Sequence, residues 1–152
     1  MNKKIFAFAM VLAIFAGCTG TQAEPDIKVS YPKVTHSAMT ENAISAFMFI
    51  ENKGSADDYL VSARIKELPD KRVEVHDVVD GKMVHIEKIK IPAGAVVELK
   101  MGSYHVMGFD ITEHVDEITL VLNFGKSGEI EVVATVPEKE ETTAEGMDMG
   151  GM

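Results

Sequence analysis

His76-Asp77-Val78-Val79-Asp80-Gly81-Lys82-Met83-Val84-His85 is the stretch that decides the fold. Asp-Gly is a strong signal for a two-residue hairpin turn, because a type I′ turn needs positive φ at both central positions. Such a turn pairs Val78 with Met83 and His76 with His85, and alternation puts all four side chains on one face. The two imidazoles then lie about 5 Å apart at their Cβ atoms. A wider turn would shift this register, and Met83 and His85 would exchange roles.

The rest of the central region, from Asp26 to Val136, consists of short apolar runs separated mostly by Gly, Pro, Asn or Asp. Many short strands without a persistent helical period are typical of an all-β antiparallel sandwich or barrel. About 110 residues are enough for one domain. We expect strands over residues 28–34, 43–51, 59–65, 72–79, 83–91, 96–101, 104–112, 117–123 and 130–136.

His105-Val106-Met107 is the clearest candidate for chemistry. Residues two apart in a strand project from the same face, so an imidazole and a thioether stand side by side. That pair suits copper, above all Cu(I), and suits magnesium or calcium poorly. The alternative is that Met107 packs in the core with His105 at its edge.

The N-terminus is predicted to be a signal peptide over residues 1–23. Its apolar run, Ile5 to Ala16, is shorter than the roughly 20 residues needed to span a bilayer as a helix. Phe15-Ala16-Gly17-Cys18 resembles a bacterial lipobox, although Phe15 stands where that motif normally has Leu. Lipid on Cys18 is the favoured outcome, and cleavage after Thr21-Gln22-Ala23 is the alternative.

Cys18 is the only cysteine in the chain. An exported domain without disulfides must be held together by its core. The missing cysteine also excludes a blue-copper electron carrier, which needs a Cys thiolate as ligand. Zinc-ribbon and thioredoxin-like interpretations are excluded for the same reason.

The C-terminus, residues 137–152, changes character and is predicted to be a disordered, acidic, Met-rich tail. It has no aromatic and no β-branched apolar residue after Pro137. Its thioethers, at Met147, Met149 and Met152, would suit a second Cu(I) site. The competing interpretation is an acidic, solubilising appendage.

The formal net charge of −9 argues against nucleic acid or an anionic membrane surface as a partner. Membrane contact is expected only through lipid on Cys18, and we expect a monomer. No Ser-His-Asp set or paired carboxylate is supported by spacing, so the chain is not predicted to be an enzyme. His36 and His114 are expected to be surface residues.

Four ordered motifs carry a family resemblance: Phe47 to Asn52, Ile91-Pro92-Ala93-Gly94, Tyr104-His105-Val106-Met107 and Asn123 to Ile130. Together they resemble the periplasmic copper chaperones known as PCu(A)C, over nearly the whole of Val29 to Val136. The resemblance implies a cupredoxin-like β-sandwich that binds one Cu(I). It also implies delivery of copper to a respiratory oxidase, with cytochrome oxidase subunit II as the expected kind of acceptor.

The family's ligand pattern is a His, then a Met, then His-x-Met. His76 matches the first position, and His105 and Met107 match the closing pair. The second position departs, because the family's Met, about eleven residues after the first His, is replaced here by Glu87. Counting from the Asp-Gly turn instead, that ligand falls on His85, with Met83 two residues earlier on the same face. The fourth ligand is therefore Met83 or His85, and a histidine there would favour Cu(II).

Two other functions remain open at this level. One alternative to the copper chaperone is an immunoglobulin-like structural module with incidental Met and His residues, and the other is a copper-dependent redox enzyme. The predicted location is the periplasm or the extracytoplasmic face of the membrane in every case.

Overall fold

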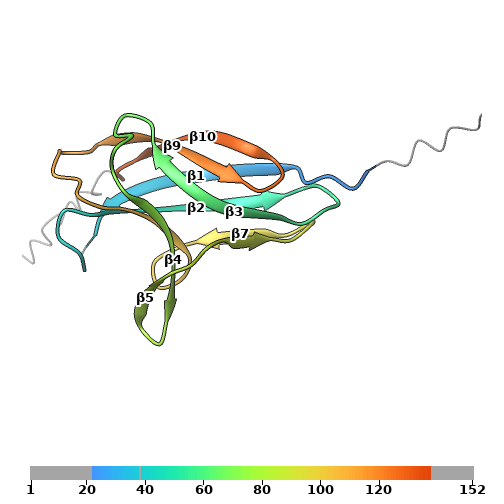
Figure 1. Cartoon of the computed structure of the whole chain (residues 1–152), viewed down its shortest axis with the longest axis horizontal. Coiled ribbons are helices and arrows are strands. Elements are labelled where there is room, and N and C mark those ends of the chain that lie inside the picture. The colour runs from blue at the N-terminus through green and yellow to red at the C-terminus, as the bar shows by residue number, and fades with distance from the viewer. Residues whose placement is uncertain (1–21, 38, 138–152) are drawn as a thin grey trace, which may run out of the picture.

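The computed structural model describes residues 22–37 and 39–137, and strands are the regular secondary structure of this part of the chain (Figure 1). This confirms the predicted all-β class. None of these residues forms a helix that could cross a lipid bilayer. The strands are β1 (Ile27–His36), β2 (Ile44–Asn52), β3 (Asp58–Ile65), β4 (Val73–Val79), β5 (Lys82–His85), β6 (Ile89–Ile91), β7 (Val96–Leu99), β8 (His105–Gly108), β9 (Glu117–Phe124) and β10 (Gly128–Thr135).

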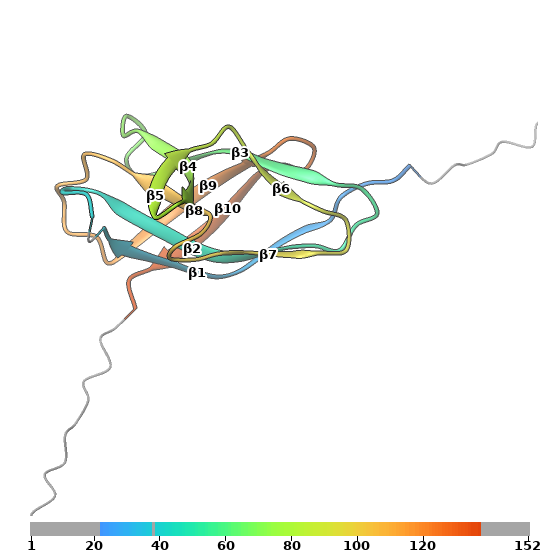
Figure 2. The ribbon, with the colours of Figure 1, turned by 90° about the horizontal axis from the view of Figure 1, so that it is seen from below.

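The strands form one curled sheet in the order β5-β4-β8-β2-β1-β10-β9-β3-β6. β7 pairs with β2 off this path, while β6, which precedes it in the chain, pairs with β3. The link between them therefore connects the two sides of the curl. Figure 2 shows β1, β2 and β7 along one side and β3 and β6 along the other. The apolar core lies between the two sides, with Val34, Ile50, Leu60 and Leu122 fully buried. This is the β-sandwich expected from the sequence.

β1 does not alternate regularly along its length. Val34 belongs to the core and Val29 packs against it, although residues an odd number apart face opposite sides of a regular strand. A register shift between Ser30 and Lys33, with Tyr31 at φ 51, rotates the strand so that both valines face inward. β1 also pairs with β10 in parallel. The sequence predicted an antiparallel sheet, and this one pair departs from it.

The single strand expected over residues 83–91 is two strands. β5 pairs with β4 at one edge of the sheet, whereas β6 pairs with β3 at the other. The chain leaves the first edge after His85 and reaches the core again at Ile89, which is buried. The apolar pattern runs through this break, so the sequence does not reveal it.

The β4–β5 hairpin has the predicted register. His76 pairs with His85 and Val78 with Met83. Asp80 at φ 50 and Gly81 at φ 74 both have the positive φ that a type I′ turn requires. The hairpin projects from the body of the sandwich (Figure 1). Its strand β4 pairs with β8, and β5 forms the edge of the sheet.

Candidate metal centre

Three histidines lie side by side across β5, β4 and β8. His76, on the middle strand, pairs with His85 on one side and with His105 on the other. The ring centroid of His76 is 5.9 Å from that of His85 and 5.7 Å from that of His105. His76 and His105 are nearly buried, at 7% and 4% exposure. The hairpin predicted the first pair, whereas the second depends on a pairing between strands far apart in the chain.

The two methionines of the predicted ligand set belong to the same face. Met107 follows His105 by two residues in β8 and pairs with Glu74 of β4. Met107 is fully buried, yet Val106, which projects from the opposite face, is the β8 residue in the main core cluster. Met83 pairs with Val78, two residues along β4 from His76. All five predicted site residues therefore share one face of β5, β4 and β8.

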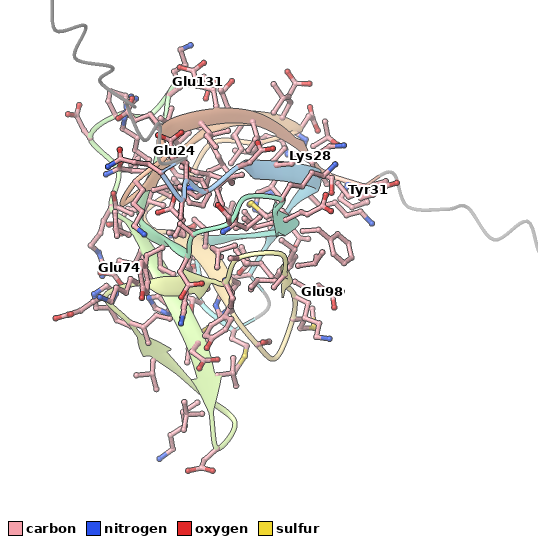
Figure 3. The ribbon with its side chains drawn as sticks, turned by 90° about the vertical axis from the view of Figure 1, so that its right-hand side faces the viewer. Glu24, Lys28, Tyr31, Glu74, Glu98 and Glu131 are labelled. Carbon is pink, nitrogen blue, oxygen red and sulfur yellow. The ribbon has the colours of Figure 1, made fainter. Side chains whose placement is uncertain are left out.

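Glu74 is a member of this cluster that the sequence analysis missed. It precedes His76 by two residues in β4, and Figure 3 shows it where the hairpin leaves the body. Its Oε2 is 2.8 Å from His76 Nε2 and 3.8 Å from His85 Nδ1, and its Oε1 is 2.6 Å from Arg72 Nη1. The hydrogen bond to His76 and the charge of Arg72 lower the pKa of the Glu74 carboxyl, against the opposing effect of burial. The spacing from His76 was the available signal.

Hydrogen bonds assign free nitrogens in two of the histidines. His105 Nδ1 lies 2.8 Å from the Ser103 carbonyl, so it donates a proton there and leaves Nε2 with a lone pair. This is the arrangement that commonly orients a metal-binding imidazole. His76 Nδ1 is buried without a hydrogen-bond partner. An unsatisfied buried polar atom costs about 1–3 kcal/mol, and coordination to a metal would remove that cost. The donor set therefore fits a metal ion.

A groove with a volume of about 220 Å³ opens beside His105. Met83, Met39 and Met101 line it, and Met39 and Met101 are 74% and 80% exposed. Large apolar side chains gathered at the surface beside a site are a common mark of an interaction surface. The sequence analysis did not single out Met39 or Met101, because their proximity follows from the fold.

The two remaining histidines are surface residues, as predicted. His36 and His114 are exposed, with their rings stacked at a centroid distance of 6.3 Å. His114 also contacts Asp116, at 3.0 Å. The predicted lipid site at Cys18 and the C-terminal methionines Met147, Met149 and Met152 lie outside the residues that the structure describes.

Residues 27–136 match the family described as "Putative lipoprotein LpqE-like". The chain belongs to the LpqE-like family. No curated protein sequence matches it. Its fold is similar to the solved structure "Copper-bound PCuAC domain from PmoF2", with a TM-score of 0.60 and 24% identity over 72% of this chain and 91% of that one. It is similar also to "Apo PCuAC domain from PmoF1", with a TM-score of 0.61 and 22% identity over 73% and 92% of the two chains.

These comparisons support the resemblance to PCu(A)C that the sequence motifs predicted, with the solved domains supplying the likeness in fold. The family's description as a lipoprotein agrees with an exported protein. In this LpqE-like protein the fold brings imidazole and thioether groups to one face, which is a donor set for a soft or borderline metal ion.

Proposed function

We propose that this LpqE-like protein binds copper and passes it to an acceptor protein, acting as a chaperone and not as an enzyme. The single observation that carries the proposal is the alignment of His76 and His105 on paired strands, with Met107 on the same face. The copper-bound state named for the PmoF2 domain supports the choice of metal. Thioether sulfur favours Cu(I), the form we propose as the main cargo.

His76, His105 and Met107 supply three ligands in this proposal. The fourth is Met83 or His85. Met83 lines the groove beside His105, and its sulfur would complete a soft site. His85 has a ring next to His76 but a side chain that is 59% exposed, and its nitrogen would favour Cu(II).

Neutral ligands suit a carrier in an oxidising compartment. A pair of thiolates there risks conversion to a disulfide, whereas thioether and imidazole groups keep binding. Such ligands also hold Cu(I) less tightly than thiolates would, which helps release. We propose export to the periplasm or the outer face of the membrane, with lipid on Cys18 as the anchor.

The groove beside the site is the proposed approach for the acceptor. Met39 and Met101 line it and are exposed, so an acceptor can contact their thioethers. Copper would then leave the site on the side of His105, which lines the same groove. The acceptor would be a copper-requiring protein such as cytochrome oxidase subunit II.

An anaerobic Cu(I) titration, read by X-ray absorption, tests the proposal. We expect one copper with sulfur and nitrogen ligands, and at least about tenfold weaker binding after His105→Ala or Met107→Leu. His114→Ala is the matched control, because His114 is exposed and contacts only surface groups. If the wild-type protein takes up no copper, the immunoglobulin-like structural module is the better interpretation. Catalytic turnover with a reductant and oxygen would indicate a redox enzyme instead.

A further inference from the structure

A second set of possible metal ligands lies at the β5 end of the row formed by His85, His76 and His105. Glu74, His76 and His85 each offer one ligand atom, and these atoms all lie within 4.8 Å of one another. Two ligands of a tetrahedral Zn²⁺, each about 2.0–2.1 Å from the metal, are about 3.4 Å apart. Glu74 Oε2 lies 2.8 Å from His76 Nε2 and 3.8 Å from His85 Nδ1, so its distances to the two nitrogens lie on either side of that value. His85 lies on the edge strand β5, and its side chain is 59% exposed, so it has room to adjust.

One carboxylate oxygen of Glu74 is paired with an arginine, which leaves the second oxygen available to a cation. Arg72 occupies Oε1, and the Arg72 guanidinium is itself held 3.8 Å above the Phe109 ring. Oε2 therefore faces the two imidazoles, 2.8 Å from His76 Nε2 and 3.8 Å from His85 Nδ1. A divalent cation bound by the three groups would place a positive charge directly beside this carboxylate oxygen.

The state of His76 is an independent indication of metal binding. The residue is more than nine-tenths buried, and its Nδ1 has no hydrogen-bond partner, while its Nε2 faces Glu74. This buried imidazole therefore has a partner on one nitrogen and none on the other. A neutral imidazole carries one lone pair, so His76 can bind a metal either through Nδ1 or, after its proton moves to Nδ1, through Nε2 on the Glu74 side.

We propose that Glu74, His76 and His85 form a second, harder binding position, for a divalent cation of the Zn²⁺ or Cu²⁺ class. A carboxylate with two imidazoles suits these ions, whereas the thioethers suit Cu(I). The inference rests on the proposed function for the soft position, with which it shares His76. It assigns His85 to the hard position and so leaves Met83 to the soft one. The protein then holds copper in either oxidation state, through two overlapping ligand sets.

Zn²⁺ is the probe for the hard position, because it does not undergo redox change and favours nitrogen and oxygen donors. Calorimetry on the full exported chain should show Zn²⁺ binding to the wild-type protein. Glu74→Gln and His85→Gln should each raise the Zn²⁺ dissociation constant by about tenfold or more. Glu129→Gln is the matched control, because Glu129 also pairs with an arginine, Arg64, at 3.1 Å, and it should leave the constant unchanged.

An anaerobic Cu(I) titration of the same variants separates the two positions. Met107→Leu should weaken Cu(I) binding and spare Zn²⁺, whereas Glu74→Gln should weaken Zn²⁺ binding and spare Cu(I). Equal losses of both metals in Glu74→Gln would mean that Glu74 only positions His76, and the inference would be overturned. The inference would also be overturned if neither Glu74→Gln nor His85→Gln changed the Zn²⁺ dissociation constant. Normal Cu(I) binding alongside either result would leave the proposed function standing, and circular dichroism checks that each variant is folded.

Discussion

Asn52 shows how one buried side chain can connect several parts of the molecule. Its Oδ1 accepts hydrogen bonds from the amides of Asp26 and Gly54, and its Nδ2 donates to the carbonyls of Ala56 and Ile91. The side chain is fully buried, and each of its polar atoms is used twice. It thereby joins the N-terminal segment, the turn after β2 and the end of β6.

Asn52→Asp should destabilise the fold by about 2–4 kcal/mol. The change replaces two donors with an acceptor that faces two carbonyl oxygens in a buried place. Urea unfolding measures the loss, and Asn123→Asp is the control, because Asn123 makes only one exposed hydrogen bond, to Ser62. A loss below about 0.5 kcal/mol in Asn52→Asp would contradict the network described here.

Asp58 is the residue-scale source of a pH dependence. Its side chain is fully buried and accepts hydrogen bonds from the amides of Tyr59, Lys126 and Ser127 and from the Ser127 hydroxyl. Burial alone would raise its pKa, but the hydrogen bonds from the Ser127 hydroxyl and the amides outweigh that effect and hold the pKa below the usual value of an aspartate. The stabilisation is therefore present above the unfolded pKa and is lost as pH falls through the lower, folded pKa.

Unfolding by urea should therefore show stability falling as pH drops from about 5 toward 2. In Asp58→Asn the fall should be shallower, because this carboxyl no longer takes up a proton on unfolding. The variant should also be less stable at pH 7. Identical slopes for the two proteins would show that other carboxyls account for the acid sensitivity.

At the scale of elements, local chemistry made some features predictable and left others hidden. The Asp80-Gly81 turn set the register of β4 and β5 correctly, because that pairing needs no information from elsewhere in the chain. The pairing of β4 with β8 and the bulge in β1 depend on tertiary packing. The hairpin therefore grouped His76, Met83 and His85, whereas His105 and Met107 joined them in the prediction only through the resemblance to PCu(A)C. Glu74 was missed, although its spacing of two residues from His76 in one strand was an available signal.

The hairpin turn offers an element-scale test of the site. Gly81 and Gly128 both have φ 74 with open space around the missing Cβ, so alanine at either position meets only backbone strain. That strain is about 1–2 kcal/mol. Gly81→Ala should weaken Cu(I) binding by displacing Met83, while Gly128→Ala, at the start of β10, should not. Equal effects on Cu(I) affinity, measured by anaerobic titration, would show that the hairpin does not position a ligand.

At the scale of the whole molecule, β4 and β8 divide stability and binding between their two faces. Val75 and Val106 point into the core, whereas His76 and His105, their neighbours in the chain, face the proposed copper position. The histidines are nearly buried, although neither belongs to the main apolar core cluster. A domain without disulfides can therefore place polar ligands within a sheet and keep its apolar interior continuous.

Val106→Ala and His105→Ala should separate these two roles. Val106→Ala removes buried methyl groups and should lower the free energy of unfolding by about 2 kcal/mol, with little effect on Cu(I) affinity. Because a ligand that binds only the folded state raises the melting temperature, Cu(I) should stabilise wild-type and Val106→Ala proteins by similar amounts. His105→Ala should melt near the wild-type temperature without copper and gain much less on its addition. If Val106→Ala lost the copper-induced shift as fully as His105→Ala, the core and the site would be one cooperative unit and the division between the two faces would be wrong.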